Sequence, residues 1–96
     1  MIDLGLAQKI RPGVVLSVPV LDHERALVSY VPRTTSVRKT RFEVSRAAAG
    51  FLPGVFDAQG VGTIPSVKLV RKIGPLDART LAEVEESVRH WLGLAR

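Results

Sequence analysis

Residues 31–44 read VPRTTSVRKTRFEV, and this stretch decides how the chain is organised. It starts at the end of one apolar run and stops inside another. Three adjacent hydroxyl side chains and four cations lie between the two runs: Thr34, Thr35, Ser36, Arg33, Arg38, Lys39 and Arg41. Buried strands do not carry so many polar groups. The stretch therefore predicts a loop between two strands that presents hydrogen-bond donors and positive charge.

The apolar runs on either side of this loop predict the strands. Residues 14–20, VVLSVPV, are rich in β-branched residues and almost continuously apolar, which suits a strand buried on both faces. Residues 26–31, ALVSYV, predict its hairpin partner across the polar residues 21–25. Residues 42–44, FEV, alternate in polarity and predict a short strand after the loop.

The remaining strands are predicted to be short. Residues 2–7 are expected to form a first strand, and residues 55–56 and 61–64 are expected to be strand pieces around the polar residues 57–60. Pro65 is expected to open a helical turn before a last strand that ends near Gly74. Residues 47–49 predict a helical turn, and Pro53-Gly54 predicts a tight turn.

The C-terminal segment predicts an amphipathic helix of about four turns. Asp77 is a good N-cap, because its carboxylate can accept the free amides of the first turn. Apolar residues recur at helical spacing at Leu81, Val84, Val88 and Trp91, and Gly93 is a plausible stop. Several short strands followed by one helix predict a mainly β (α+β) fold, a small barrel with a packed helix, as a single domain over residues 1–96.

Composition limits the possible functions. The chain has 96 residues and a formal net charge of +5, which favours polyanionic partners or reflects solubility alone. It has no cysteine, which excludes a disulfide scaffold, a thiolate metal site and a Cys nucleophile. No apolar run approaches the roughly 20 residues that a membrane span needs, and the first residues do not resemble a signal peptide. A cytoplasmic protein without membrane contact is expected.

The residues that could carry chemistry are arginine and hydroxyl groups. His23 and His90 are expected on a solvated turn and a helix surface, and there is no nucleotide-binding glycine loop. Arg11 precedes a strand with its backbone restrained by Pro12, so its guanidinium can present a planar fork to a phosphate. Together with hydroxyl groups at residues 34–36, it suits RNA cleavage by the substrate's own 2′-hydroxyl without a metal or cofactor. Alternatively, Arg11 is a surface cation and residues 34–36 are an ordinary turn.

Five segments, in order, resemble the MazF/PemK (Kid) family of toxins from bacterial toxin–antitoxin pairs. Residues 9–17 resemble the family's Lys/Arg-x-Arg-Pro-x-Val-Val-Leu segment, residues 31–36 its Pro-x-Thr-Ser segment, and residues 42–44 the strand that follows. Residues 59–65 resemble its Gln-x-x-Thr-Ile/Val turn, and residues 69–94 its C-terminal half.

The resemblance implies an SH3-like β-barrel of the MazF/Kid/CcdB type, usually a homodimer, that cleaves single-stranded RNA at short sequences without a metal. It places the catalytic groups on Arg11 and Thr35, with Ser36 beside them. RNA-binding residues would be Lys9, Arg33, Thr34, Arg38, Lys39, Arg41 and Gln59. Cations on this path would neutralise backbone phosphates. A cognate antitoxin with an acidic C-terminal segment is the expected protein partner.

The chain also departs from the family pattern. Members usually begin with a longer first strand, so the strand at residues 2–6 is expected to be shortened, and the family's loop histidine has no counterpart. Gln59-Gly60 stands where some members carry Asp-Gln. A non-catalytic SH3-like barrel that binds DNA, RNA or a protein such as gyrase is the alternative function, and a structural domain is a third.

Overall fold

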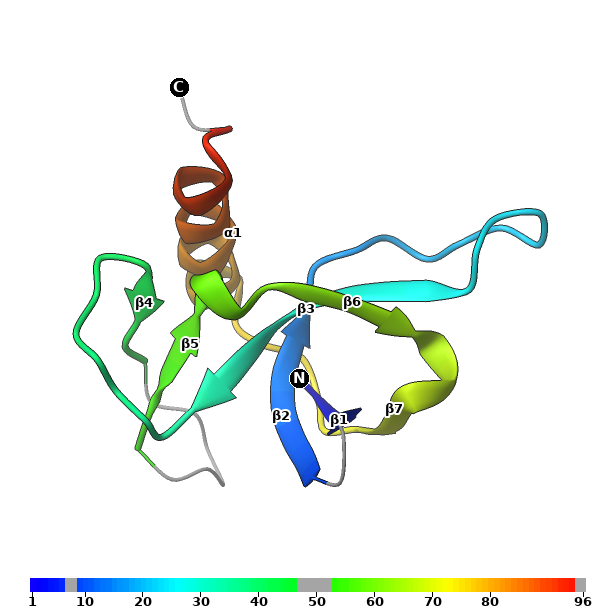
Figure 1. Cartoon of the computed structure of the whole chain (residues 1–96), viewed down its shortest axis with the longest axis horizontal. Coiled ribbons are helices and arrows are strands. Elements are labelled where there is room, and N and C mark those ends of the chain that lie inside the picture. Colours follow the sequence, from blue (N-terminus) through cyan, green and yellow to red (C-terminus); the bar gives the residue numbers. More distant parts are fainter. Residues whose placement is uncertain (7–8, 47–52, 95–96) are drawn as a thin grey trace.

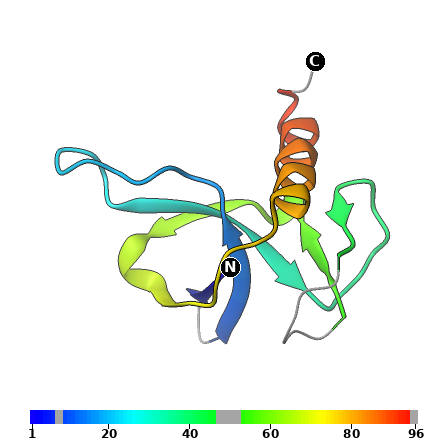
Figure 2. The ribbon, with the colours of Figure 1, turned by 180° about the vertical axis from the view of Figure 1, so that it is seen from behind.

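The computed structural model describes residues 1–6, 9–46 and 53–94, with the backbone alone over the described part of residues 4–10 (Figures 1 and 2). Within these residues, seven antiparallel strands, two single 3-10 turns and one α-helix follow one another. They are β1 (Ile2–Leu6), β2 (Lys9–Val15), β3 (Leu27–Thr34), β4 (Glu43–Val44), β5 (Val55–Asp57), η1 (Ala58–Gly60), β6 (Gly62–Pro65), η2 (Ser66–Lys68), β7 (Leu69–Lys72) and α1 (Ala78–Leu92).

The long strand β3 connects the two halves of the sheet. One edge of β3 pairs with β2 from Gly13↔Pro32 to Val15↔Tyr30. Its other edge pairs first with β6, through residues 27–30, and then with β5, through residues 33–34. The strand order is β4-β5-β3-β2-β1-β7, with β6 beside the first half of β3. The predicted hairpin of β2 with β3 and the mainly β fold with one C-terminal helix are confirmed.

Neighbouring residues of β2 and β3 point to opposite faces of the sheet, and each face buries its own core. Val14 and Val31 pack with Phe56 and Val84 under α1. Val15 and Tyr30 pack with Ile2 on the other face. Both faces of β2 are covered at Val14 and Val15, which explains why the apolar run starts there without alternation. For these two residues the predicted burial on both faces is confirmed.

The helix α1 begins and ends at the predicted residues. The Asp77 carboxylate accepts the Thr80 N–H at 3.0 Å, and Gly93 ends the helix in the left-handed region at φ 73°. Val84 is completely buried on the face toward the sheet. No helix within the described residues is long and apolar enough to cross a membrane.

The predicted strand at residues 14–20 is wrong beyond Val15. Residues 16–26 instead form an arm that projects from the body (Figures 1 and 2). The Ser17 hydroxyl accepts the Ser29 N–H at 2.9 Å in place of a backbone carbonyl, and Pro19 has no N–H to donate, so the ladder with β3 ends here. Val18 is 79% exposed.

The later strands follow the predicted order. The polar residues at 57–60 form β5's last residue and η1, and η2 with β7 are the predicted helical turn and last strand. β1 pairs with β2 on one edge and with β7 on the other. The helical turn predicted at residues 47–49 lies outside the described residues.

Candidate functional site

Arg11 and the three adjacent hydroxyl groups lie at the same end of the β2–β3 pair. Pairing between these strands begins at Gly13↔Pro32, and a continued register would place Arg11 opposite Thr34. Prolines stand on both strands where they part, Pro12 and Pro32, and neither can donate to the ladder. Figure 1 shows the beginning of β2 and the end of β3 separating below this point. Arg11 is exposed there.

The hydroxyl groups form a hydrogen-bonded turn. Thr34 Oγ1 accepts the Ser36 N–H at 3.0 Å, and the Thr35 carbonyl accepts the Val37 N–H at 3.1 Å. Thr35 and Ser36 are exposed. Gly54 passes so close that a methyl group on it would overlap the Thr34 carbonyl oxygen and lie 3.0 Å from the Thr34 carbonyl carbon. The absence of a side chain at Gly54 therefore sets the position of the turn.

The loop between β3 and β4, residues 35–42, is organised around the Glu43 carboxylate. Its Oε2 accepts the Arg38 N–H at 3.0 Å, and its Oε1 accepts the Thr40 N–H at 3.2 Å. Thr40 Oγ1 accepts the Phe42 N–H at 3.2 Å. Lys39, between the two bonded amides, takes a left-handed backbone at φ 59°. The loop's backbone is thus held from inside, which leaves its cations in solvent.

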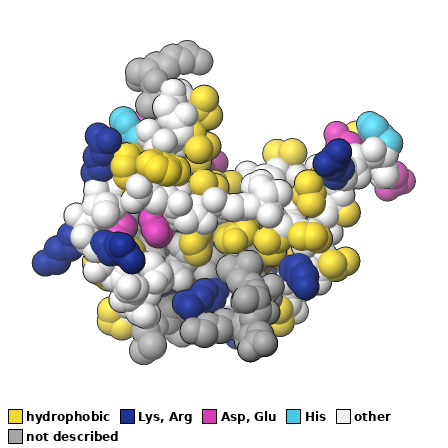
Figure 3. Space-filling view, viewed as in Figure 1, with side chains coloured by type: hydrophobic (Ala, Val, Ile, Leu, Met, Phe, Trp, Pro, Cys, Tyr) yellow, Lys and Arg dark blue, Asp and Glu magenta, His cyan; other side chains and the backbone are white. Residues whose placement is uncertain are grey.

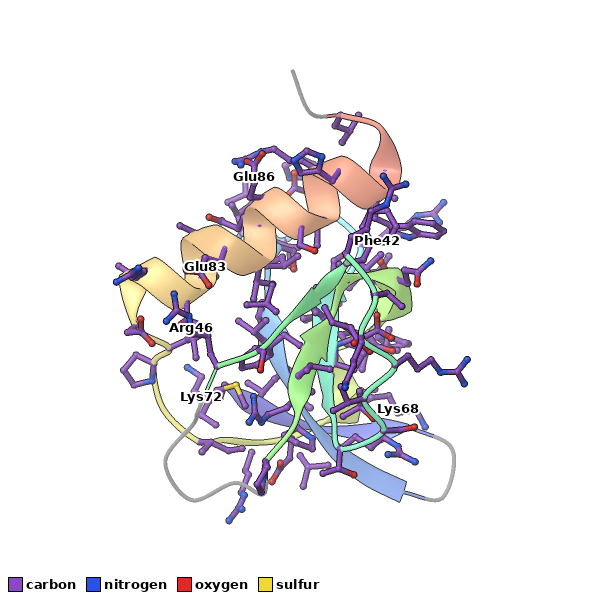
Figure 4. All side chains as sticks on the ribbon, turned by 90° about the vertical axis from the view of Figure 1, so that its left-hand side faces the viewer. Phe42, Arg46, Lys68, Lys72, Glu83 and Glu86 are labelled. Atoms are coloured by element: carbon purple, nitrogen blue, oxygen red, sulfur yellow. The ribbon has the colours of Figure 1, made fainter. Side chains whose placement is uncertain are left out.

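The exposed cations of this loop are Arg38, Lys39 and Arg41. The Arg41 guanidinium carbon lies 4.6 Å from the centre of the Phe42 ring, a cation–π contact. The buried Phe42 ring in turn contacts Trp91 edge-to-face, with 5.3 Å between ring centres. The Phe42 carbonyl accepts the Ser87 hydroxyl at 3.1 Å, and Figure 4 shows Phe42 beside the C-terminal half of α1.

Arg33 is not on the surface with the other loop cations, contrary to the expectation of an exposed RNA-binding residue. It is 4% exposed. Its guanidinium carbon lies 4.9 Å from the Phe56 ring centre, and its Nη1 donates to the Arg46 carbonyl at 3.0 Å. Burial lowers the pKa of the Arg33 guanidinium. It shares the face of β3 that Val31 occupies, and alternation directs that face toward α1.

Arg46 continues this connection to the helix. Its guanidinium forms an ion pair with Glu83, with Nε donating to Oε2 at 2.9 Å and Nη2 donating to Oε1 (Figure 4). The hydrogen bonds and charge of this pair lower the pKa of Glu83 and raise that of Arg46. The end of β3 is therefore tied through Arg33 and Arg46 to α1.

The other predicted residues are more scattered. The backbone of Lys9 begins β2, and Gln59 is exposed on η1, where its N–H is bonded to Asp57 at 3.1 Å. His23 lies at the tip of the arm, and His90 pairs with Glu86 at 3.2 Å on the exposed side of α1. In the described part of the chain, no three His, Cys, Asp or Glu residues are grouped so that they could hold a metal ion.

Sequence reasoning missed Glu43 and Gly54 as residues that build the site. The sequence pattern indicates only a polar strand residue at Glu43 and a turn residue at Gly54. The available signal was the position of Glu43 directly after the charged loop. A carboxylate at the end of a loop often accepts hydrogen bonds from the loop's backbone N–H groups.

An apolar hollow of about 740 Å³ lies at the foot of the arm, away from the hydroxyl turn. Its lining includes Val14, Val18, Val20, Leu27, Leu69 and Leu81. Figure 3 shows hydrophobic side chains along the arm and charged ones gathered at its tip. Val18, Val20 and Leu21 are large apolar side chains left exposed here. An apolar surface of this kind is typical of a protein interface.

Known proteins share this fold. The Mycobacterium tuberculosis toxin MazF-mt6 matches at 30% identity over 99% of this chain and 98% of its own, with a TM-score of 0.81. An endoribonuclease in complex with its cognate antitoxin from Mycobacterial species matches at 21% identity over 99% of this chain and 92% of its own, with a TM-score of 0.82. A MazE–MazF structure from Deinococcus radiodurans matches at 24% identity over 98% of this chain and 91% of the matched chain, with a TM-score of 0.81.

A comparison with curated protein sequences found no match. The family model described as the PemK-like, MazF-like toxin of type II toxin–antitoxin systems matches residues 3–92. The match runs from the second residue of β1 to the end of α1, and it includes Arg11, the hydroxyl turn and the cationic loop. The chain therefore belongs to the PemK/MazF family of type II toxins.

Proposed function

We propose that this toxin is a metal-independent, sequence-specific endoribonuclease that cleaves single-stranded RNA, including mRNA, and so inhibits translation and growth. One observation carries the proposal: exposed Arg11, near the beginning of β2, and exposed Thr35 and Ser36, just after the end of β3, lie at the end of the strand pair where the two strands part. Such a site can hold one phosphodiester between a guanidinium and a turn of donors.

In the proposed reaction the substrate supplies the nucleophile. The ribose 2′-oxygen loses its proton and attacks the adjacent phosphorus, and the bond to the 5′-oxygen breaks. The products are a 2′,3′-cyclic phosphate and a 5′-hydroxyl, whose oxygen takes up a proton. The Arg11 guanidinium stabilises the negative charge that develops on the non-bridging oxygens, and Thr35 and Ser36 orient the phosphate.

The RNA strand would follow the cationic loop. Arg38, Lys39 and Arg41 are exposed on a backbone that Glu43 holds, so they can contact phosphates at a low entropic cost. Lys9, Thr34 and Gln59 remain proposed RNA contacts. Arg33 is left out of this path, because its guanidinium is committed to Phe56 and the Arg46 carbonyl.

We also propose the partners of this single toxin domain. An antitoxin with an acidic segment would cover the cationic loop in the cytoplasm, where the RNA substrate is. Structures of similar toxins with their antitoxins support this partner. A second copy of the chain would cover the apolar hollow and the exposed Val18 and Leu21, because both are surfaces that water hydrates poorly.

The test is RNA cleavage in EDTA. The purified protein is incubated with a long single-stranded RNA, and the new ends are mapped. Specific cuts that leave cyclic phosphates are expected, and Arg11→Ala should slow them by about 10²–10³-fold. Arg25→Ala, which removes an exposed cation from the tip of the arm, should cut as the parent does. Binding without any cut would indicate a non-catalytic barrel and overturn the proposal, as would full activity in Arg11→Ala.

A further inference from the structure

Trp91 presents an aromatic surface beside the cationic loop. It lies in the last turn of α1 and remains 41% exposed, although one side contacts Phe42. An indole packed only to cover the core would be more fully buried, since Trp is highly buried on average. The exposed part of the ring is free to stack, in a place where the nearest loop carries cations.

Arg41 and Trp91 are held against the same ring. The Arg41 guanidinium carbon and the Trp91 ring centre lie 4.6 and 5.3 Å from the Phe42 ring centre. Phe42 itself is anchored, because its carbonyl accepts both the Ser87 hydroxyl at 3.1 Å and the Ala58 N–H at 3.0 Å. A cation and an indole are thus both held against one ring, close enough to each other for a single nucleotide to reach both.

Hydrogen bonds and ion pairs at the C-terminal end of α1 weaken the repulsion that a phosphate would otherwise meet there. The carbonyl of Arg89 accepts the Leu94 N–H at 2.8 Å, and that of His90 accepts the Gly93 N–H at 3.2 Å. The nearby acid, Glu86, is paired with Arg89 at 3.0 Å and with His90 at 3.2 Å. These carbonyls and this acid are therefore paired within the chain, and Arg41 is a cation held against the same ring as Trp91.

We infer that Trp91 and Arg41 form a second RNA subsite, in which a base of single-stranded RNA stacks on the indole while its phosphate contacts Arg41. The inference rests on the proposed RNA-cleaving function. The loop from Thr35 to Arg41 connects the proposed cleavage site to this subsite, and its cations Arg38, Lys39 and Arg41 are exposed. Every base has a π-face, so the subsite adds affinity for longer RNA without altering the cleavage sequence.

Trp91 is the only tryptophan in the chain, so its intrinsic fluorescence reports on the subsite directly. The probe is a 2′-O-methyl oligoribonucleotide, which keeps bases and phosphates but lacks the attacking hydroxyl. Saturable quenching of Trp91 is expected with the full oligonucleotide. An oligonucleotide of the same length whose distal nucleotides are abasic should still bind but leave the fluorescence nearly unchanged.

Variants separate stacking from a structural role. Trp91→Leu, which keeps an apolar cover on Phe42, should weaken binding of the long oligonucleotide about ten-fold or more, measured by anisotropy of a labelled strand. Trp91→Phe should restore most of the affinity. Val67→Ala, which trims an exposed apolar residue on η2, should not change binding. Trp91→Leu should still cut a short RNA that covers only the cleavage site at the parental rate.

The outcomes distinguish the two claims. Binding detected by anisotropy without quenching of Trp91, or equal affinity in Trp91→Leu, would overturn the subsite and leave the cleavage site standing. No RNA binding and no cleavage by the folded parent would overturn both.

Discussion

The β3–β4 loop and the arm between β2 and β3 both adjoin β3, yet they are held in opposite ways. The loop is polar, and its amides are bonded to the Glu43 carboxylate and to hydroxyls. The arm is mostly apolar between its foot and its charged tip, and it has few such bonds. They lie chiefly at its foot, where Leu16 donates to Ser29, and at its tip, where Leu21 donates to Glu24. The loop is preorganised by its own hydrogen bonds, whereas the arm leaves its apolar side chains exposed.

Gly54→Ala should have the largest effect, because it acts on the backbone from which the loop starts. The added methyl group would overlap the Thr34 carbonyl, which cannot move away as a flexible side chain can. We expect the free energy of unfolding to fall by about 1–3 kcal/mol, measured by urea denaturation. Cleavage should fall as well, since Thr35 would be displaced. Unchanged stability and activity would show that the close approach does not position the turn.

Glu43→Gln tests the loop's internal support, with Glu24→Gln as the matched change in the arm. Gln keeps one acceptor oxygen and loses the charge, so the Arg38 and Thr40 amides cannot both keep strong bonds. Bonds to a charged group stabilise more than neutral ones, and we expect a loss of about 1–2 kcal/mol. Glu24 accepts one exposed amide, and its variant should stay within about 0.5 kcal/mol of the parent. Equal losses in the two variants would contradict the difference between loop and arm.

Val18→Ser combined with Leu21→Ser tests whether the arm serves a second copy. Both side chains are largely exposed, 79% and 64%, so the folded chain should lose little stability by itself. Sedimentation at micromolar concentration should show a dimer in the parent and a shift toward monomer in the variant. Val67→Ser is the control, since Val67 is also exposed but lies on η2. A parent that is monomeric throughout would remove the second copy as the arm's partner.

Acid should loosen the attachment of α1 to the segment after β4 and leave the arm unaffected. The pKa of Glu83 is lowered from 4.5 by its hydrogen bond to Arg46, and that of Asp77 is lowered from 3.8 by its bonds to Thr80. Because both values are lowered on folding, the stability they add is complete above the unfolded values and is lost as the pH falls through the folded ones. Thermal melts from pH 6 to 3 should therefore show a small decline that is reduced in Glu83→Gln. An equal decline in Glu83→Gln would show that other groups cause the loss of stability in acid.

Local patterns were sufficient for the elements whose signals lie within a few residues. Asp77 and Gly93 bounded α1, and the apolar spacing between them marked its buried face. The alternation of Phe42-Glu43-Val44 marked β4, and the apolar runs paired β2 with β3. The residues proposed for catalysis were brought to one end of this pair because an antiparallel hairpin places the start of one strand beside the end of the other.

The same patterns did not predict burial correctly where it depends on which other part of the protein covers a side chain. Val18 and Val20 are as apolar as Val14 and Val15, but they are exposed, whereas Val14 and Val15 each pack into a core on their own face of β2. Apolar character alone does not tell whether the cover comes from the same chain. Arg33 and Arg38 are the same residue type five positions apart, yet one is buried over Phe56 and the other is exposed.

The amino-acid sequence was enough to predict the mainly β fold, the terminal helix, the cationic loop and the chain's likeness to a toxin family. These features rest on local periodicity, capping and residue order. Three contacts became visible only in the folded chain: Glu43 holds the loop, Gly54 lies against Thr34, and Phe42 joins Arg41 to Trp91. Each of these contacts joins a loop or strand to a neighbour whose position depends on strand register and on the packing of α1. Residue order along one segment does not contain that information.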